Sequence, residues 1–585
     1  MAAVHTEAAA IFGGLLINEA EDKIQFVKTR PYQPYNSSEP ITFKIPGNTS
    51  QYVSLRDSYL YVKCHLEETD QFGGALRIKK EPILAPSVPS PGKKRRSREA
   101  NLGDNEYRLN GKRSRRDVEG DEEEEETSDS RMMDDAPATE VESEEDEEEE
   151  EEDGTCPPLY TNKEIAGFLD DAMYRYHQAD TARRRAEKAR KANREEEYLH
   201  LMTVAEGTQD AALNAMAKYL QAKHQHRKIV GLDGAIVPTD NILHSMWNGI
   251  DVFMNGEQVS TTNQKYMYKS YIETVLNNSA STKQYQLHLN GFYGDEGNKD
   301  EFFNLSFNHG MEKRFHKFMD GKYTHMMGFL MSDMMNIQAA IVNGVEIDIV
   351  LIPNLDNIRL QTFGEKRYGR MVIDQILMYV CKRTFSKEVI LAHTSLLEKE
   401  EAVYPFKRTE IRAYNGNKGN TQVTIENPYE SKIPTRFIMG MIDADAYTGN
   451  FRKNPLNFQH YDISRAGFYI DDESISKPPY VLNPAKGEFI EPLMELYHIL
   501  GKAGEDQDIG ITQENYINGM FLLPFDVTPT SAANMEYLSR KEGGNCRLEL
   551  HFHKPLPGNI IILTYAIFPA ELRIDGARNC RVVPV

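Results

Sequence analysis

The feature that most constrains this chain is a long charged stretch, residues 70–228, which interrupts sequence that is otherwise typical of β-strands. Within it, residues 119–153 hold 22 acidic side chains against one basic residue, Arg131, and so account for the whole formal net charge of −21. Because like charges repel, this stretch favours an extended, solvated state over a packed core. The rest of the chain is neutral as a whole, which argues against a broad basic surface or a specific site for nucleic acid.

The second half of this insertion has helical character. Thr161 followed by Glu164 matches a capping box at a helix start, and Ala, Glu, Lys and Arg are frequent in the residues that follow. A narrow apolar stripe is formed by Ala182, Ala186, Ala189 and Ala192. These patterns predict a solvated helical hairpin at residues 161–226 and a disordered segment at residues 80–158.

Strand patterns lie on both sides of the insertion. In Tyr59–Glu67 and again in Arg547–His553, apolar and polar side chains alternate, which is the period of a strand with one buried face. Asn255-Gly256 follows such an alternation and predicts a tight hairpin turn. The nearly continuous apolar run Asn559–Phe568 predicts a strand that is covered on both faces.

Many short strands, with few amphipathic helices between them, indicate a mainly β fold built of sandwiches or jelly rolls. The same observation argues against a doubly wound parallel sheet, in which helices alternate with strands. Outside the insertion, the length of the chain suits two β domains of about 200 residues each. The sequence shows no internal repeat that would demonstrate such a doubling.

Three blocks of sequence stand out: Asn241–Asn277, Pro434–Thr530 and Asn545–Val583. They resemble the major capsid proteins of the Polinton/Maverick and adintovirus group, and they occur in the order found in that family. The dipeptide NP and the segments FDVTP and HKPLP mark the last two blocks at characteristic separations. The resemblance covers most of the chain outside the insertion, and the insertion is where this sequence departs from the family.

The resemblance implies two tandem jelly-roll β-sandwiches, the first of them interrupted by the charged, partly helical and partly disordered insertion. On that basis we expect an N-terminal arm at residues 1–38, a first jelly roll at 39–360, interrupted at 70–228, and a second at 361–585. It further implies a structural protein of the virion that forms homotrimeric capsomers. Expected partners are other copies of the chain, neighbouring capsomers and a minor capsid or penton protein.

Two basic clusters in the insertion have the spacing of a bipartite nuclear localisation signal. They consist of Lys93, Lys94, Arg95, Arg96 and Arg98, and of Lys112, Arg113, Arg115 and Arg116. An import receptor binds such segments in an extended form, so the clusters suggest nuclear import and assembly in the host nucleus. A solvated charge run or a contact with nucleic acid remains the alternative interpretation.

The N-terminal segment contains an apolar run, Ala8–Ile17, that is too short for a membrane-spanning helix and lacks the basic residues of a secretory signal. We therefore expect no membrane anchor. Within the run, Ile11–Leu15 resembles the cleavage consensus of adenovirus-type maturation proteases, which implies possible cleavage between Gly14 and Leu15. A pattern this short also arises by chance in chains of this length.

We expect no catalytic site, metal or cofactor. The five cysteines show no zinc or redox spacing, and the pairs His551/His553 and His224/His226 lack an evident third ligand, so ordinary structural histidines are the simpler interpretation. The chain contains no motif of a phosphate-binding loop, a serine hydrolase or a metalloprotease. The Gly/Asp/Asn-rich segment Tyr293–Glu301 lacks the Lys-Ser/Thr of a phosphate cradle and is interpreted as an ordinary loop.

Two other functions are open at this point. A nuclear protein could use the acidic runs to bind histones or other basic partners, and deletion of residues 119–153 would then abolish that binding. A β-sandwich enzyme acting on carbohydrate would need a cleft with paired carboxylates, and the sequence indicates no such pair.

Overall fold

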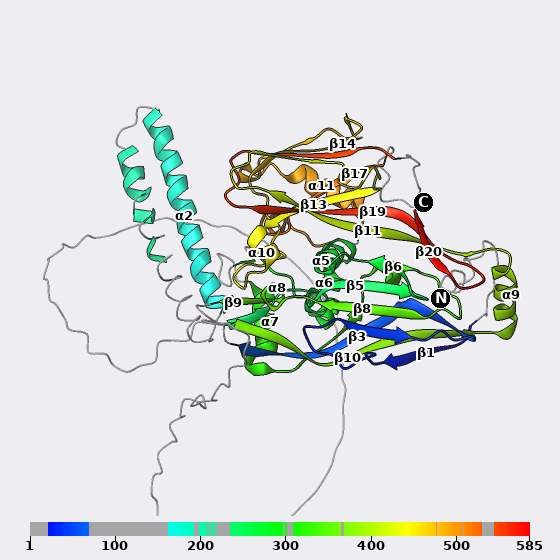
Figure 1. The fold of residues 1–585 in the computed structure, drawn as a ribbon. Helices are drawn as coiled ribbons and strands as arrows, with labels where there is room; N and C mark the ends of the chain where they lie inside the picture. Colours follow the sequence, from blue (N-terminus) through cyan, green and yellow to red (C-terminus); the bar gives the residue numbers. More distant parts are fainter. Residues whose placement is uncertain are drawn as a thin grey trace, which may run out of the picture. The chain divides into compact units, whose positions relative to one another are not determined.

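The computed structural model describes residues 21–69, 162–191, 235–296, 299–300, 308–363, 368–475, 477–506, 508–528 and 543–584, together with parts of 198–218. Strands dominate the described residues on both sides of the insertion and form antiparallel sheets (Figure 1). The predicted mainly β fold class is therefore confirmed.

The first sandwich consists of two four-stranded sheets. In the first sheet the neighbours are, in order, β1 (Glu21–Thr29), β10 (Tyr368–Phe385), β3 (Gln51–Thr69) and β7 (Thr324–Phe329). In the second sheet they are β2 (Ile41–Ile45), β8 (Ile347–Pro353), β5 (Trp247–Met254) and β6 (Glu257–Thr261). A separate ladder joins β4 (Ala235–Pro238) to β9 (Leu360–Phe363).

The second sandwich also consists of two sheets. The first contains, in order, β11 (Ala402–Gly416), β19 (Ile560–Ile574), β13 (Arg436–Asp443) and β17 (Leu522–Asp526), and β20 (Cys580–Pro584) pairs with β19. The second contains β12 (Gln422–Glu426), β18 (Cys546–Phe552), β14 (Ile463–Ile470) and β15 (Glu473–Ser474), and β16 (Tyr480–Val481) pairs with β14.

The two sandwiches have the same topology. When β4, β9, β16 and β20 are set aside and the strands of each sandwich are numbered one to eight along the chain, both contain a sheet of order 1-8-3-6 and a sheet of order 2-7-4-5. This is the jelly-roll arrangement, in which Greek-key connections carry the chain back and forth between two packed sheets. The predicted pair of tandem jelly rolls is thereby confirmed by strand order.

Local sequence explains several of these elements. In β3 the residues Leu60, Val62 and Cys64 are fully buried and alternate with partly exposed neighbours, as the sequence pattern predicts. The predicted hairpin turn at Asn255-Gly256 joins β5 to β6, and both residues have positive φ, 49° and 85°. Tight hairpin turns of this kind need positive φ at both central positions, which Asn and Gly tolerate.

The expected domain boundaries are wrong at two places. Strand β1 lies inside the segment expected to be an N-terminal arm, yet it pairs along its length with β10. Strand β10 lies beyond residue 361, in the part assigned to the second jelly roll, yet it pairs with β3 of the first. The first sandwich thus runs from β1 to β10, because an eighth strand must return between the first and third strands to complete the sheet.

Helices occupy the connections between strands. The α-helices there are α4 (Ile242–Ser245), α5 (Tyr266–Asn277), α6 (Ala280–Gln284), α7 (His309–Phe318), α8 (Asp356–Arg359), α9 (Lys387–Leu397), α10 (Ala444–Thr448), α11 (Ile490–Ile499) and α12 (Gln513–Ile517). The 3-10 helices are η2 (Gln286–Asn290), η3 (Met319–Gly321), η4 (Asp333–Asn336) and η5 (Pro484–Lys486).

The insertion separates the third and fourth strands of the first sandwich, β3 and β5. Its described part contains α2 (Asn162–Lys191) and further helical residues at 198–205 and 207–209, which agrees with the helical character predicted for residues 161–226. Ala182, Ala186 and Ala189 of the predicted stripe are buried. Residues 80–158 lie outside the described residues. Among the helices that the structure describes, none combines the length and apolar character of a membrane-spanning helix.

Candidate functional site

The two sandwiches share an extensive junction, and this junction is the best-defined polar site in the described residues. Strand β19 of the second sandwich is buried at every position from Ile560 to Phe568, as predicted for a strand covered on both faces. On its inner face, Thr564 accepts a hydrogen bond from Tyr429 within the second core (2.7 Å). On its outer face, the Tyr565 hydroxyl donates to Glu273 of α5, which belongs to the first sandwich (3.2 Å).

The first polar cluster of the junction is centred on Lys269 of α5. Its ammonium group lies 2.6 Å from the Glu273 carboxylate and 3.3 Å from the Asp333 carboxylate, and it donates to the Met331 carbonyl (2.8 Å). The three charged side chains are less than a tenth exposed. Burial alone lowers the pKa of Lys269, but the two carboxylates more than offset it, so that the pKa lies above its ordinary value. Lys269 is therefore held as a cation.

The same cluster reaches a second strand of the other sandwich. The Thr409 amide of β11 donates to Asp333 of η4 (3.1 Å). With the bond from Tyr565 to Glu273, each acidic partner of Lys269 accepts one hydrogen bond from the second sandwich. Buried polar groups carry a large penalty when they lose a partner, so this arrangement selects one relative orientation of the two sandwiches.

The second polar cluster of the junction surrounds Arg314 of α7, which is fully buried. Its guanidinium lies 2.8 Å from Asp295 and 3.4 Å from Asp240, and its Nε donates to the Pro238 carbonyl (2.8 Å). Both carboxylates are almost completely buried. The arginine therefore neutralises two acidic groups that have little access to water.

Asn454 and Asn457, in the connection between β13 and β14, link this cluster to the second sandwich. The Asn454 side chain donates to Asp295 (3.2 Å), and its backbone amide donates to Asp300 (2.6 Å). The Asn457 side chain donates to the other oxygen of Asp300 (2.8 Å). Two asparagines of one sandwich thus satisfy carboxylates supplied by the other.

Lys299 completes the second cluster. Its ammonium group donates to the Tyr271 hydroxyl of α5 (2.6 Å) and to the Leu456 carbonyl of the second sandwich (3.0 Å). Burial lowers the pKa of Lys299 to about 8, although the nearby carboxylates of Asp295 and Asp240 act in the opposite direction. Unlike Lys269, this lysine bonds mainly to neutral oxygens.

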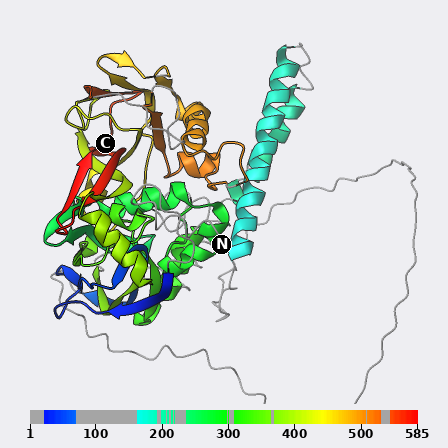
Figure 2. The same ribbon diagram turned by 90° about the vertical axis from the view of Figure 1, so that its right-hand side faces the viewer.

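A third contact between the two sandwiches lies near the start of β11. The Tyr404 hydroxyl accepts from the Val342 amide (3.0 Å) and donates to the Ala340 carbonyl (3.2 Å), both in the first sandwich. The apolar residues around it, such as Leu572 and Ile574 of β19, pack in the core of the first sandwich. Figure 2 shows the red β20 segment close to the green elements of the first sandwich, and β20 contacts β6 there. The two sandwiches are therefore joined by apolar packing as well as by polar clusters.

A buried histidine next to the junction gives a pH prediction. His244 of α4 bonds through Nδ1 to the Tyr266 hydroxyl (2.8 Å), and burial lowers its pKa to about 3 from 6.5. Between pH 6.5 and 3 the His244 imidazole is protonated in the unfolded chain but stays neutral in the folded chain. The free energy of unfolding therefore falls as the pH falls toward 3, by up to about 1.4 kcal/mol per pH unit. Denaturant unfolding at several pH values should show a shallower fall for His244→Gln. Equal slopes for the two proteins would contradict this assignment.

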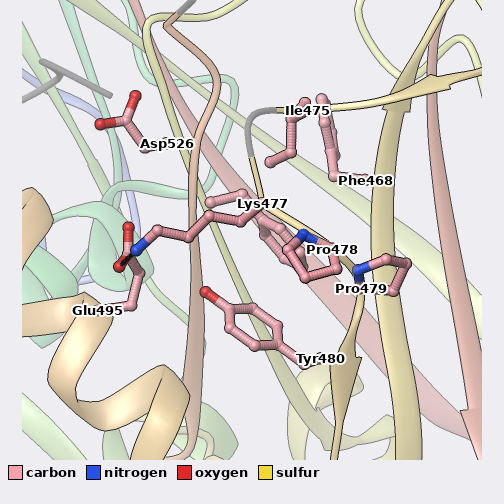
Figure 3. A pocket seen from close by; sticks show the side chains of 9 residues that line it. Phe468, Ile475, Lys477, Pro478, Pro479, Tyr480, Glu495 and Asp526 are labelled. Carbon is pink, nitrogen blue, oxygen red and sulfur yellow. Dashed lines mark hydrogen bonds and ion pairs between the residues drawn. The ribbon is translucent and has the colours of Figure 1, made fainter. Parts of the chain in front are cut away.

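Two pockets among the described residues show no metal-ligand cluster. A small pocket of about 10 Å³ in the second sandwich is lined by Pro478, Pro479 and Tyr480, and Lys477 pairs with the buried Glu495 of α11 across it (Figure 3). A wider pocket of about 380 Å³, lined by β6, β11 and β20, opens beside the junction. No group of three or more metal-ligating side chains occurs in the part of the chain that the structure describes.

The residues predicted for nuclear import and for cleavage lie outside the described residues. This applies to both basic clusters, from Lys93 to Arg116, and to Gly14 and Leu15. His551 and His553 are described and lie on β18 and directly after it; His553 bonds to the Leu482 carbonyl (2.9 Å), a structural role. His224 and His226 are not among the described residues.

Sequence reasoning missed both junction clusters. The segment Tyr293–Glu301 was interpreted as an ordinary loop, but it supplies Asp295, Lys299 and Asp300 to the second cluster. Lys269 and Glu273 have the spacing of an exposed helical ion pair, so these two residues by themselves do not indicate burial. The available signal was the apolar character of α5 around them, which is unusual for a solvated helix.

Comparison with known proteins gives one relative and several similar folds. No family model matches the chain. It is 22% identical over 353 residues to an uncharacterized protein of Caenorhabditis elegans, and the match covers 58% of this chain and 80% of that protein.

Solved structures with a similar fold include three viral proteins. A protein of the Sputnik virophage is 8% identical with a TM-score of 0.49, and the match covers 98% of this chain and 90% of that one. The mavirus major capsid protein (8% identical, TM-score 0.43, coverage 98% and 92%) and the Faustovirus major capsid protein (7% identical, TM-score 0.43, coverage 95% and 92%) are also similar. At these identities and TM-scores the likenesses assign neither a family nor a function to this chain.

Proposed function

We propose that this chain is a major capsid protein that forms homotrimeric, pseudo-hexagonal capsomers of an icosahedral double-stranded DNA virus, or of a virus-like integrated element of the Polinton/Maverick and adintovirus group. The observation that carries the proposal is the repeated strand order, 1-8-3-6 and 2-7-4-5, in two sandwiches joined by buried polar clusters. The three sequence blocks that resemble this family support the same function. The proposed role is structural, without a catalytic step.

Physical reasoning connects this architecture to a shell. Two sandwiches of equal topology give one chain two similar sides, so a closed ring of three copies presents six similar sides to its neighbours. Such a ring keeps its geometry only if the two sandwiches of each chain keep a fixed orientation. The clusters around Lys269 and Arg314 supply that rigidity, because relative movement would take from their buried carboxylates the hydrogen bonds that Tyr565, Thr409 and Asn454 donate across the junction.

The oligomeric state tests this function directly. Purified full-length chain is expected to have three times the mass of one chain in mass photometry, because two-sandwich subunits bury their lateral faces only in a closed ring. Negative-stain class averages of the same sample should show a six-lobed outline. A protein that remains monomeric at micromolar concentration, with no trimers in the images, would contradict the proposal.

The acidic runs favour a second candidate function, binding of histones or other basic partners, because residues 119–153 carry the whole net charge. Deleting this stretch separates the two functions. For a capsid protein we expect trimers to form as in the wild type, because the described strands of both sandwiches lie outside the deleted residues. Histone capture by the wild type in a pull-down, abolished by the deletion, would instead favour the histone-binding function.

The remaining partners of the proposed capsid protein are an import receptor, a maturation protease and a minor capsid or penton protein. Import would act on the basic clusters at Lys93–Arg98 and Lys112–Arg116, deliver the chain to the host nucleus and precede its incorporation into the virion. Cleavage would fall between Gly14 and Leu15. Mass spectrometry of protein from particles decides the last point, because an intact N-terminus excludes cleavage there.

A further inference from the structure

The outer face of the first sheet of the first sandwich carries a continuous row of aromatic side chains. Cross-strand pairing aligns Lys28 of β1, Tyr379 of β10, Tyr59 of β3 and Phe329 of β7. The rings of Tyr379 and Tyr59 stack with centroids 4.9 Å apart, Phe329 lies 6.2 Å beyond Tyr59, and the Lys28 ammonium lies 5.4 Å from the Tyr379 ring. We call this surface the aromatic face.

The aromatic face is open in the single chain. Phe329 is 54% exposed, and Phe26 of β1, whose ring contacts Tyr59 at 5.7 Å, is 48% exposed. The next row includes Met327, which is also exposed and pairs with Tyr61. Contiguous exposed aromatic and methionine side chains are typical of protein interfaces rather than of solvated sheet faces.

The corresponding face of the second sandwich is covered. Strand β19 has the same place in the second sandwich as β10 in the first, and Tyr565 lies between Ile411 and Ile438 there as Tyr379 lies between Lys28 and Tyr59. Helix α5, from the connection between the fifth and sixth strands of the first sandwich, covers that face and is buried from Tyr266 to Leu276. The covered face and its helix form the internal junction.

The helix of the second sandwich that is equivalent to α5 does not pack against another sheet in the single chain and is buried on one side only. Helix α11 lies in the connection between the fifth and sixth strands of the second sandwich. Its Ile490 and Met494, one turn apart, are 46% and 57% exposed, while the opposite side of the helix, including Leu493 and Leu496, is buried. Each chain therefore has one open sheet face and one half-open helix at equivalent positions.

We propose that α11 of one copy packs on the aromatic face of the next copy and repeats between chains the junction that α5 makes within a chain. This inference rests on the proposed trimer and specifies its interface. The contact is heterologous, so each copy contributes both surfaces and the ring closes when the third copy meets the first. Six sandwiches then follow one another around the ring through junctions of one kind.

Charge complementarity supports a second copy of the chain as the partner that packs on the aromatic face. Exposed Glu488 and Glu491 flank the open side of α11. Exposed Lys23, Lys28 and Arg30 lie on and directly after β1, at the edge of the aromatic face. Opposite charges at the rim of an apolar contact favour the correct pairing and disfavour pairing of either surface with itself.

A lysine in the centre of either surface tests the interface. Met494→Lys and Phe329→Lys should each shift the trimer–monomer midpoint to at least about tenfold higher protein concentration, because an apolar contact is lost and the charge of the lysine would have to be buried in the interface. Leu391→Lys, on α9 and 68% exposed, is the matched control and should leave the midpoint unchanged. Circular dichroism melting verifies that the monomers of all three variants are folded.

Cysteine cross-linking supplies a second readout that does not depend on affinity. Co-expressed, differently tagged chains carrying Phe329→Cys and Met494→Cys should give a covalent heterodimer with a short bis-maleimide. A pair carrying Leu391→Cys and Met494→Cys should give none. A wild-type protein that is monomeric overturns the proposed function itself. Wild-type trimers that tolerate both lysine variants and give no specific cross-link overturn only this interface.

Discussion

Replacement of Arg314 by methionine is expected to lower the free energy of unfolding by about 3–5 kcal/mol. The change removes the guanidinium that pairs directly with Asp295 and Asp240, which are 2% and 1% exposed, and leaves Lys299 as the only nearby cation among the described residues. Methionine roughly fills the volume of the aliphatic stem, so the cost comes from the two carboxylates and not from a cavity. Urea denaturation of wild type and variant, followed by tryptophan fluorescence of the buried Trp247, measures the difference.

The matched control is Arg581→Met. Arg581 also pairs with a carboxylate, Glu401, at 2.8 Å, but its side chain is 61% exposed. Water screens such a pair, so its loss should cost less than about 1 kcal/mol. If both variants lost the same small amount of stability, the cluster around Arg314 would not have the energetic role that we give it.

The sequence predicted those parts of the fold that depend on local pattern. The alternation in β3, the turn at Asn255-Gly256 and the doubly covered strand, from Ile560 to Phe568, are confirmed, because each follows from period and turn chemistry. Tandem jelly rolls followed from the resemblance, and the strand order confirms them. The disorder predicted for residues 80–158 stays a prediction, since these residues lie outside the described ones.

The domain boundary was not predictable from local pattern. In β1 no residue is fully buried among those whose exposure is described, so its sequence lacks the apolar alternation that identifies other strands. Its place in the sheet is set by pairing with β10, for example Val27 with Val380, across more than three hundred residues of chain. Pairing over such separations depends on the whole fold.

The polar junction was missed for a related reason. Asp240, Asp295 and Arg314 stand in different segments, and only the folded chain brings them together. Burial of a charge is a property of the surrounding packing, and the sequence around a charged residue normally indicates a solvated position. From sequence alone, the segment Tyr293–Glu301 is therefore interpreted as a solvated loop, and Lys269 with Glu273 as an exposed ion pair on a helix.

The second large effect is expected for Lys269→Met, which should also cost about 3–5 kcal/mol of unfolding free energy. This variant leaves Glu273 and Asp333 buried beside one another without the ammonium group that lies 2.6 and 3.3 Å from them. Denaturant unfolding measures the loss, and limited proteolysis should cut the chain faster at residues 386–401, the segment between β10 and β11.

The triple variant Lys269→Met, Glu273→Gln, Asp333→Asn distinguishes charge from packing. The amide oxygens of Gln and Asn can still accept from the Tyr565 hydroxyl and the Thr409 amide, so both hydrogen bonds to the second sandwich are retained. Because a neutral cluster has no uncompensated buried charge, the triple variant should recover most of the stability lost by the single variant. Equal losses in the two would mean that the shape of Lys269, rather than its charge, holds α5 against β11 and β19. Recovery would show that the orientation of the sandwiches depends on hydrogen bonds across the junction, with the lysine present to neutralise their acceptors.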